Sequence, residues 1–194
     1  KRRMPAETKL SPKITDFLEY LEVERNVSPL TIRNYRHYLT KFATWLADRY
    51  PQVSLEKADL EIIRKYRLFL SRTLDKNNLP LKKVTQGYYL IALRSFLKWL
   101  VKNDIKVLPP EKIELPRGES RSLKFLTADQ VERLLNQPHI ASPCGLRDKA
   151  VLEVLFSTGL RVSELVSLDK DQVNLKTREF GVIGKGRRQR VVFL

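Results

Sequence analysis

The apolar residues in the first half of the chain recur at the three- and four-residue spacing of amphipathic helices. Ser11-Pro12 and Ser28-Pro29 each predict a helix start, with serine as the N-cap and proline as the first helical residue. Asp59 is expected to cap a third helix, and a fourth is expected from about residues 83–85 to Val101. The four apolar faces consist of Ile14, Phe17, Leu18 and Leu21; Ile32, Tyr35, Leu39, Phe42 and Leu46; Ile62, Ile63, Tyr66, Phe69 and Leu70; and Leu90, Leu93, Phe96, Leu97 and Leu100.

Four amphipathic helices with short connections predict a helical bundle over residues 1–107. Trp45 and Trp99 are expected in the core of this bundle or at its edge. Residues 108–125 contain three prolines and a glycine among charged residues, a composition that predicts an extended linker. The linker is the expected domain boundary, and residues 126–194 are expected to form the second domain.

The pattern after the linker mixes helices with strands. Thr127 and Gln130 are spaced as a capping box, which predicts a helix that carries Val131, Leu134 and Leu135. Further helices are expected over 146–158, ending at Gly159, and over 162–168. Short strands are expected over 172–175, 180–183 and 189–194, the last two joined as a hairpin whose glycines permit the turn. The expected fold class is mainly α, with a small antiparallel sheet near residue 194.

The charge balance points to a polyanionic partner. Lys and Arg number 37 against 22 Asp and Glu, a formal net charge of +15. Residues 1–117 hold 24 basic and 13 acidic residues, so the first domain carries most of the excess. A basic face gains affinity for nucleic acid by releasing counterions from phosphates, and double-stranded DNA is therefore the expected partner.

Several other classes of chemistry find no support in the sequence. Cys144 is the one cysteine, so no disulfide within the chain is expected, and neither a metal site nor a cofactor is expected. His37 and His139 are the two histidines, and we interpret them and Cys144 as structural. No apolar run approaches membrane-spanning length, and a reducing, cytoplasmic location is expected.

Two blocks in the second domain resemble the tyrosine recombinase family. The first is Arg147-Asp148-Lys149-Ala150-Val151-Leu152 followed by Ser157-Thr158-Gly159-Leu160-Arg161-Val162-Ser163-Glu164-Leu165, similar to the box around the first catalytic arginine of that family. The second is Val182-Ile183-Gly184-Lys185-Gly186 with Arg190-Val191-Val192, similar to the hairpin that bears its catalytic lysine. Upstream, Val27–Ile32 and Ala92–Phe96 look like its SAM-like core-binding domain, and the whole is closest to Xer-type recombinases and integrases.

The resemblance implies site-specific DNA recombination through a phosphotyrosyl intermediate. Arg161 would stabilise negative charge on the scissile phosphate, because a guanidinium stays charged and can bind two oxygens at once. Its place before a helix, where backbone N–H groups are free, also favours an anion. Lys185 would be the general acid that protonates the leaving 5′-oxygen. Glu164, three residues after Arg161, would support the arginine from behind.

DNA contacts are expected from the starts of the second and fourth helices, from the linker and from the hairpin turn. The candidates are Thr31, Arg33, Lys82, Lys83, Thr85, Arg94, Arg117, Arg121, Arg187 and Arg188. Arg190 adds positive charge beside Lys185.

All seven tyrosines lie between Tyr20 and Tyr89, and no histidine or tyrosine follows Lys185. The resemblance therefore predicts a fragment that binds DNA but lacks the nucleophile, taken from a longer enzyme that would assemble as a tetramer on DNA in the nucleoid. The alternative is a stand-alone DNA-binding regulator that keeps the fold without the chemistry. A weaker third possibility is a relative of type IB topoisomerases. The reading frame after Leu194 separates the first two: a His-x-x-Arg element and a later tyrosine would favour the enzyme.

Overall fold

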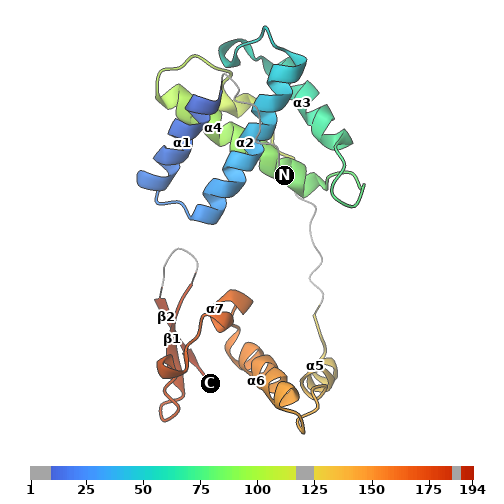
Figure 1. Ribbon diagram of the computed structural model, residues 1–194, viewed down its shortest axis with the longest axis vertical. Helices are drawn as coiled ribbons and strands as arrows, with labels where there is room; N and C mark the ends of the chain where they lie inside the picture. Colours follow the sequence, from blue (N-terminus) through green and yellow to red (C-terminus); the bar gives the residue numbers. More distant parts are fainter. Residues whose placement is uncertain (1–9, 117–124, 185–188) are drawn as a thin grey trace. The chain divides into compact units, whose positions relative to one another are not determined.

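The structure, a computed structural model, describes residues 10–116, 125–184 and 189–194. The chain divides into two compact units, Lys1–Ser120 and Arg121–Leu194 (Figure 1). The division falls within the segment 108–125. The described residues form seven α-helices, three short 3-10 helices and one two-stranded sheet, so the fold is mainly α with a small antiparallel sheet.

The first unit consists of four helices, α1 (Ser11–Val23), α2 (Pro29–Arg49), α3 (Leu60–Arg72) and α4 (Lys83–Lys102), with the 3-10 turn η1 (Leu55–Lys57) before α3. Ser28 caps α2 by accepting a hydrogen bond from the backbone N–H of Thr31, and Asp59 caps α3 in the same way from Ile62 at 2.9 Å. The expected cap of α1 is wrong. Leu10 occupies the N-cap position and the helix begins at Ser11 itself, which places Pro12 second.

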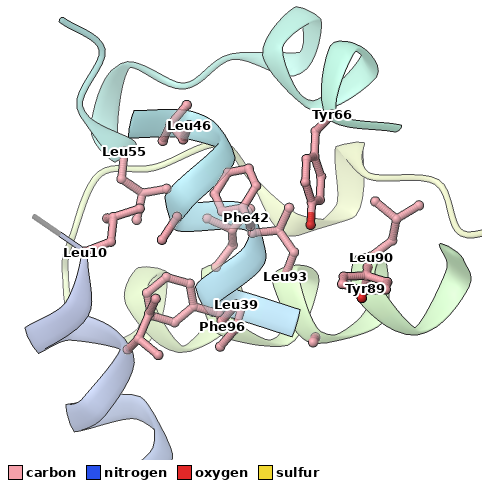
Figure 2. Close-up of a cluster of buried hydrophobic side chains, with 14 of the residues drawn as sticks. Leu10, Leu39, Phe42, Leu46, Leu55, Tyr66, Tyr89, Leu90, Leu93 and Phe96 are labelled. Atoms are coloured by element: carbon pink, nitrogen blue, oxygen red, sulfur yellow. The ribbon is translucent and has the colours of Figure 1, made fainter. Parts of the chain in front are cut away.

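The core of the first unit is built from the predicted apolar faces. Phe17, Leu39, Phe42, Tyr66 and Phe96 are at most 1% exposed. Figure 2 shows the last four within the cluster. Trp45 is buried, and Trp99 is half-buried against the same cluster, as expected. The interior faces of α1, α2, α3 and α4 thus form one continuous cluster, in which the rings of Phe42 and Tyr66 lie 4.9 Å apart.

The first part of the expected linker is packed instead of extended. Pro110 and Ile113 are buried, and the 3-10 turn η2 (Pro110–Lys112) contacts α4. Gly87 of α4 permits the close approach, because a Cβ built there would lie 3.2 Å from Cγ of Pro116. The apolar residues Val107, Leu108 and Ile113 pack against the core of the bundle, so the proline content of this segment does not make it extended.

The second unit begins with α5 (Ala128–Leu135), α6 (Pro143–Thr158) and α7 (Val162–Val166). The capping box of Thr127 and Gln130 is present, and Gly159 ends α6 in the left-handed conformation at φ +63°; both were expected. Strands β1 (Glu179–Ile183) and β2 (Gln189–Phe193) pair antiparallel, with Phe180 opposite Val192 and Ile183 opposite Gln189. The predicted antiparallel pairing of these strands is confirmed, and the turn predicted between them falls on residues 185–188, outside the described residues.

Two expected boundaries and one expected strand in this unit are wrong. Ser142 caps α6, so this helix begins one turn earlier than predicted, at Pro143. Helix α7 ends at Val166 rather than at residue 168. The strand expected over 172–175 is replaced by the 3-10 turn η3 (Lys170–Gln172) and one isolated bridge between Asn174 and Glu179. Asn174 accepts hydrogen bonds from the backbone N–H groups of Lys176 and Thr177, which favours a turn over a third strand.

Candidate functional site

The turn between α6 and α7 fixes the position of Arg161. Gly159 supplies the left-handed residue that ends α6, and the hydroxyl of Thr158 donates to the Val154 carbonyl. Leu160, 7% exposed, packs with Phe180, Val182 and Val192 of the hairpin. Arg161 follows directly as the N-cap residue of α7. Its backbone is therefore held between the buried Leu160 and the first turn of α7.

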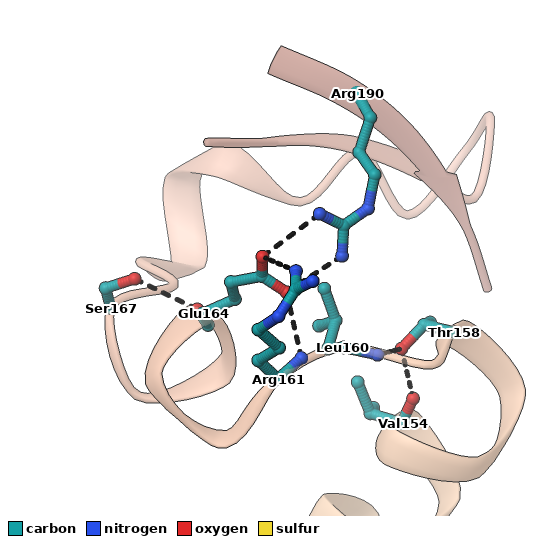
Figure 3. Close-up of polar contacts among 7 residues, drawn as sticks. All are labelled: Val154, Thr158, Leu160, Arg161, Glu164, Ser167 and Arg190. Atoms are coloured by element: carbon teal, nitrogen blue, oxygen red, sulfur yellow. Dashed lines mark hydrogen bonds and ion pairs between the residues drawn. The ribbon is translucent and has the colours of Figure 1, made fainter. Parts of the chain in front are cut away.

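Glu164 lies between two arginines (Figure 3). One carboxylate oxygen, Oε1, accepts hydrogen bonds from Nη1 of Arg161 and Nη1 of Arg190, each at 3.0 Å. The other, Oε2, accepts from Nη2 of Arg190 and from the backbone N–H of Arg161, each at 2.8 Å. Arg190 comes from β2, so this carboxylate ties α7 to the hairpin.

The three side chains differ greatly in exposure. The Glu164 side chain is 6% exposed, whereas those of Arg161 and Arg190 are 62% and 38% exposed. The hydrogen bonds from Arg190, then the backbone N–H and the guanidinium of Arg161, lower the pKa of Glu164 to about 2. The same carboxylate raises the pKa of Arg190. Glu164 is thus a fixed anion at neutral pH, and most of the Arg161 guanidinium remains accessible to a ligand.

The backbone N–H of Arg161 itself is not available to an anion, because it donates to Glu164. The contact between Arg161 and Glu164 expected from their spacing is present, while its catalytic meaning stays a prediction. Within the described ranges, no group of three or more His, Cys, Asp or Glu side chains is placed to hold a metal ion. None of the described helices is both long and apolar enough to cross a bilayer.

Five candidate residues fall outside the described residues: Lys185, Arg187, Arg188, Arg117 and Arg121. The strands that flank the first three are described. Ile183 and Gln189 are paired at the end of the hairpin, so the Lys185 segment connects two strands of known register.

The candidates in the first unit lie on two neighbouring helices, α2 and α4. Thr31 sits in the first turn of α2, where its hydroxyl is 2.9 Å from that of Ser28, and Arg33, two residues on, is exposed. Lys82 and Lys83 are exposed at the start of α4, with Thr85 half-buried behind them. Arg94 does not lie at that start: eleven residues separate it from Lys83, about 16 Å along the helix, and it is half-buried.

Sequence reasoning missed two residues that the structure brings into contacts of interest. Arg190 was seen only as extra charge, yet it makes two hydrogen bonds to Glu164 across 26 residues of chain. His37 was interpreted as structural with no partner, yet its Nε2 lies 3.0 Å from the hydroxyl of Tyr89 on α4. An alternating pattern that places Arg190 on the same strand face as the buried Val192 was the one available signal for the first contact.

Comparisons with known proteins match each of the two units to a separate family model. Residues 14–104 match the model of the phage integrase N-terminal SAM-like domain, and residues 124–194 match that of the phage integrase family. The tyrosine recombinase XerD of Haemophilus ducreyi is 37% identical over 185 residues, which is 95% of this chain and 59% of that protein. The tyrosine recombinase XerC of Salmonella typhi is 37% identical over 186 residues, with the same coverage. The chain thus spans about three fifths of the length of these relatives.

Two solved structures share the fold. The XerH site-specific recombinase bound to palindromic difH substrate has a TM-score of 0.64 at 19% identity, over 98% of this chain and 60% of that one. The Tn1549 transposon integrase in complex with circular intermediate DNA has a TM-score of 0.63 at 17% identity, over 93% of this chain and 58% of that one.

Proposed function

From the premise that this chain belongs to the phage integrase family of tyrosine recombinases, we propose that it binds duplex DNA and carries part of a recombination active site. The complete protein would cut and rejoin DNA strands at specific sites through a phosphotyrosyl intermediate. One observation carries the proposal: the exposed guanidinium of Arg161 is hydrogen-bonded to the buried carboxylate of Glu164. A cation that binds a phosphate in one fixed orientation requires such an arrangement, with one side anchored and the other accessible.

The charges around Glu164 support this role for Arg161. A single carboxylate that paired with Arg161 alone would cancel its charge. Because Arg190 shares the carboxylate, the three groups together keep a net positive charge, and Nη2 and Nε of Arg161 remain to donate to an anion. Donors fixed in place before the reaction stabilise charge that develops in the transition state, without the cost of reorganisation. Glu164 is therefore proposed as the residue that positions Arg161.

Lys185 is proposed as the general acid, delivered by the hairpin of β1 and β2. An ammonium group can give its proton to the leaving 5′-oxygen as the bond to phosphorus breaks. The nucleophile is proposed to be a tyrosine outside these 194 residues. Two tyrosines of the first unit suit that task poorly: Tyr66 and Tyr89 are buried, and burial raises the pKa of each hydroxyl.

The first unit is proposed to bind the DNA backbone through α2 and α4. Arg33, Lys82, Lys83 and Thr85 lie at or near the starts of these helices, and Arg94 extends the basic surface along α4. Contacts from Arg117, Arg121, Arg187 and Arg188, assembly as a tetramer on DNA and a cytoplasmic, nucleoid-associated location complete the proposal. The alternative of a regulator without catalysis makes the same prediction for binding and the opposite one for cleavage.

The test uses the full-length protein with a nicked suicide substrate, from which a covalent protein–DNA adduct can be trapped. Arg161→Ala should leave DNA affinity largely intact, because many phosphate contacts share the binding energy. Adduct formation should slow by about a hundred- to a thousandfold, the usual cost of losing one preorganised donor. Lys185→Ala should also slow cleavage, because the leaving oxygen would depart without a proton.

A substrate with sulfur in place of the 5′-bridging oxygen separates the two roles, since a thiolate leaves readily without protonation. It should restore cleavage by Lys185→Ala far more than by Arg161→Ala. Equal restoration of both variants, or of neither, would refute Lys185 as the acid. Failure of the unsubstituted full-length protein to form any adduct would favour the regulator. A large loss of DNA affinity in Arg161→Ala would instead identify this arginine as a binding residue.

A further inference from the structure

A groove of about 690 Å³ is lined by residues of α2 from Arg33 to Arg49 and by one residue of α3. Its lining includes four basic side chains, Arg33, Arg36, Lys41 and Arg49, and one acidic side chain, Asp48. Phe69 of α3 forms part of the wall. A groove with this excess of positive charge and an apolar wall suits a sugar–phosphate chain, whose phosphates need cations and whose sugars tolerate apolar contact. Only Arg33 of these residues was among the expected DNA contacts.

Lys41 is a fixed cation within this groove. Its Nζ lies 5.5 Å from the centroid of the Tyr89 ring and 5.8 Å from that of Phe69, so two aromatic faces hold the ammonium group. Burial lowers the pKa of Lys41 from its ordinary value. The ordinary pKa of a lysine lies far above neutral, so a lowered pKa still leaves the amine charged at neutral pH. Phe69 of α3 and Tyr89 of α4 set the position of the amine.

His37 also lines the groove, one helical turn before Lys41. Its Nε2 is engaged by the Tyr89 hydroxyl at 3.0 Å, and its ring lies edge-on to Tyr38 at 5.6 Å. Nδ1 has no hydrogen-bond partner among the residues that the structure describes. The neutral ring can satisfy Tyr89 with one nitrogen while the other faces no donor or acceptor of the protein. The protonated ring would donate from both nitrogens.

We infer that this groove is a phosphate-binding site of the first unit, and that His37 binds a DNA phosphate in its protonated form, so that DNA binding takes up a proton. The inference rests on the proposed DNA-binding function and adds to it a residue, a site and a pH dependence. Arg33, Arg36, Thr40 and Lys41 would provide the remaining donors to the phosphodiester chain.

The groups around His37 determine whether DNA affinity rises or falls with pH. Partial burial and, after it, the charge of Lys41 lower the pKa of His37 below its ordinary value. The other charged or titratable groups that face it are Arg33 and Arg36 on α2, Tyr38 on α2 and Tyr89 on α4, while α3 contributes the uncharged Phe69. Among the described residues that line the groove, the one carboxylate is Asp48, which lies eleven residues along the helix, about three turns away. A phosphate would supply the missing negative charge and raise the pKa of His37. Affinity should therefore rise as pH falls through the pKa of the bound state, and level off below that of the free state.

The experiment measures the affinity of the 194-residue chain for a fluorescein-labelled, mixed-sequence duplex by anisotropy, from about pH 8 to about pH 5.5 at constant ionic strength. The unsubstituted chain should bind about three- to tenfold more tightly at the acidic end, since one unit of pKa rise corresponds to about tenfold in affinity. His37→Gln keeps a hydrogen-bonding group for Tyr89 but cannot titrate, and its affinity should not vary in this window. His37→Arg carries a permanent charge and should bind at about pH 8 as tightly as the unsubstituted chain does at the acidic end.

Two controls keep the result specific. His139→Gln removes the other histidine, which lies in the second unit, and should retain the full pH dependence. The NMR titration of the His37 ring in the unsubstituted chain, with and without the duplex, needs no variant, and its pKa should rise on binding. A pH dependence that survives in His37→Gln, or a His37 pKa that the duplex leaves unchanged, would overturn the inference while DNA binding stands. Absence of binding at every pH would overturn the proposed function itself.

Discussion

Tyr66 and Tyr89 offer a direct comparison of two buried hydroxyl groups in one core. Tyr66 is fully buried, and its hydroxyl has no hydrogen-bond partner within the described part of the chain. Figure 2 shows its side chain reaching from α3 into the cluster. Tyr89 is 5% exposed, but its hydroxyl is paired with His37. Removing each hydroxyl by substitution with phenylalanine should therefore change stability in opposite directions.

The magnitudes follow from what each hydroxyl loses on folding. A hydroxyl buried without a partner costs about 1–3 kcal/mol by measurements on protein variants, so Tyr66→Phe should raise the free energy of unfolding by at least about 1 kcal/mol. The ring contacts with Phe42 at 4.9 Å and Trp45 at 5.0 Å remain in the variant. Tyr89→Phe removes a hydrogen bond worth about 1 kcal/mol and should lower stability by about that amount. The two variants should thus differ by about 2 kcal/mol.

Urea unfolding followed by tryptophan fluorescence measures this difference. Trp45 and Trp99 both lie in the first unit, so the signal reports that unit alone. With a slope of about 1–3 kcal/mol per molar urea, the midpoints of the two variants should lie about 0.7–2 M apart, Tyr66→Phe above the unsubstituted chain and Tyr89→Phe below it. A Tyr66→Phe midpoint below that of the unsubstituted chain, at an unchanged slope, would mean that this hydroxyl is satisfied in the folded protein and would refute the reasoning.

Three further predictions concern single contacts. Lys13 Nζ lies 2.6 Å from Glu56, and its hydrogen bond does most to lower the pKa of Glu56 to about 2. This pair should therefore stabilise the first unit above about pH 4.5 and lose its effect as pH falls toward 2. In urea titrations, Glu56→Gln should lower the free energy of unfolding by less than about 1 kcal/mol at neutral pH, because the pair is exposed, and should not lower it at acid pH. Gly159→Ala should destabilise the end of α6 by about 1–2 kcal/mol through its positive φ, as measured by hydrogen exchange of the α6 amides, whereas Gly181→Ala, which also has open space around it but lies in a strand, should not. Arg190→Met should raise the pKa of Glu164 above about 2, since Arg190 is the largest cause of its depression, and carbon NMR of the Glu164 carboxyl would detect this; an unchanged pKa would show that Arg161 alone holds the carboxylate.

Local signals predicted most of the fold. The apolar faces of α1 to α4, the caps at Ser28, Asp59 and Thr127, and the stop at Gly159 all depend on residues within a few positions of each other. Errors arose from two different causes. Ile113 lies in a proline-rich segment, yet it is buried because that segment packs back onto the helical core, which composition alone does not indicate. Residues 172–175 have strand-like composition, but the Asn174 side chain accepts hydrogen bonds from the backbone just after it and turns the chain, a local signal that the composition outweighed.

The same distinction applies to the candidate site. The pair of Arg161 and Glu164 could be predicted because three residues separate them across one helical turn. The second arginine on Glu164 could not, because its position depends on how the hairpin docks onto α7 through Leu160, Phe180 and Val192. His37 and Tyr89 likewise meet only because α2 and α4 pack together, across 52 residues of chain.

Because of these contacts, Glu164 and His37 change their charge in different pH ranges. Glu164, with a pKa of about 2, keeps its charge throughout the neutral range, so the support it gives Arg161 should not change there. The pKa of His37 starts near neutral and is lowered, so its charge responds to any anion that arrives in the groove of the first unit. For the proposed recombinase, acidification from about pH 8 to about pH 6 should thus tighten DNA binding through the first unit without changing how Glu164 positions Arg161. A pH dependence in the cleavage of DNA that is already bound should then come from groups other than Glu164, whose charge does not change in this range.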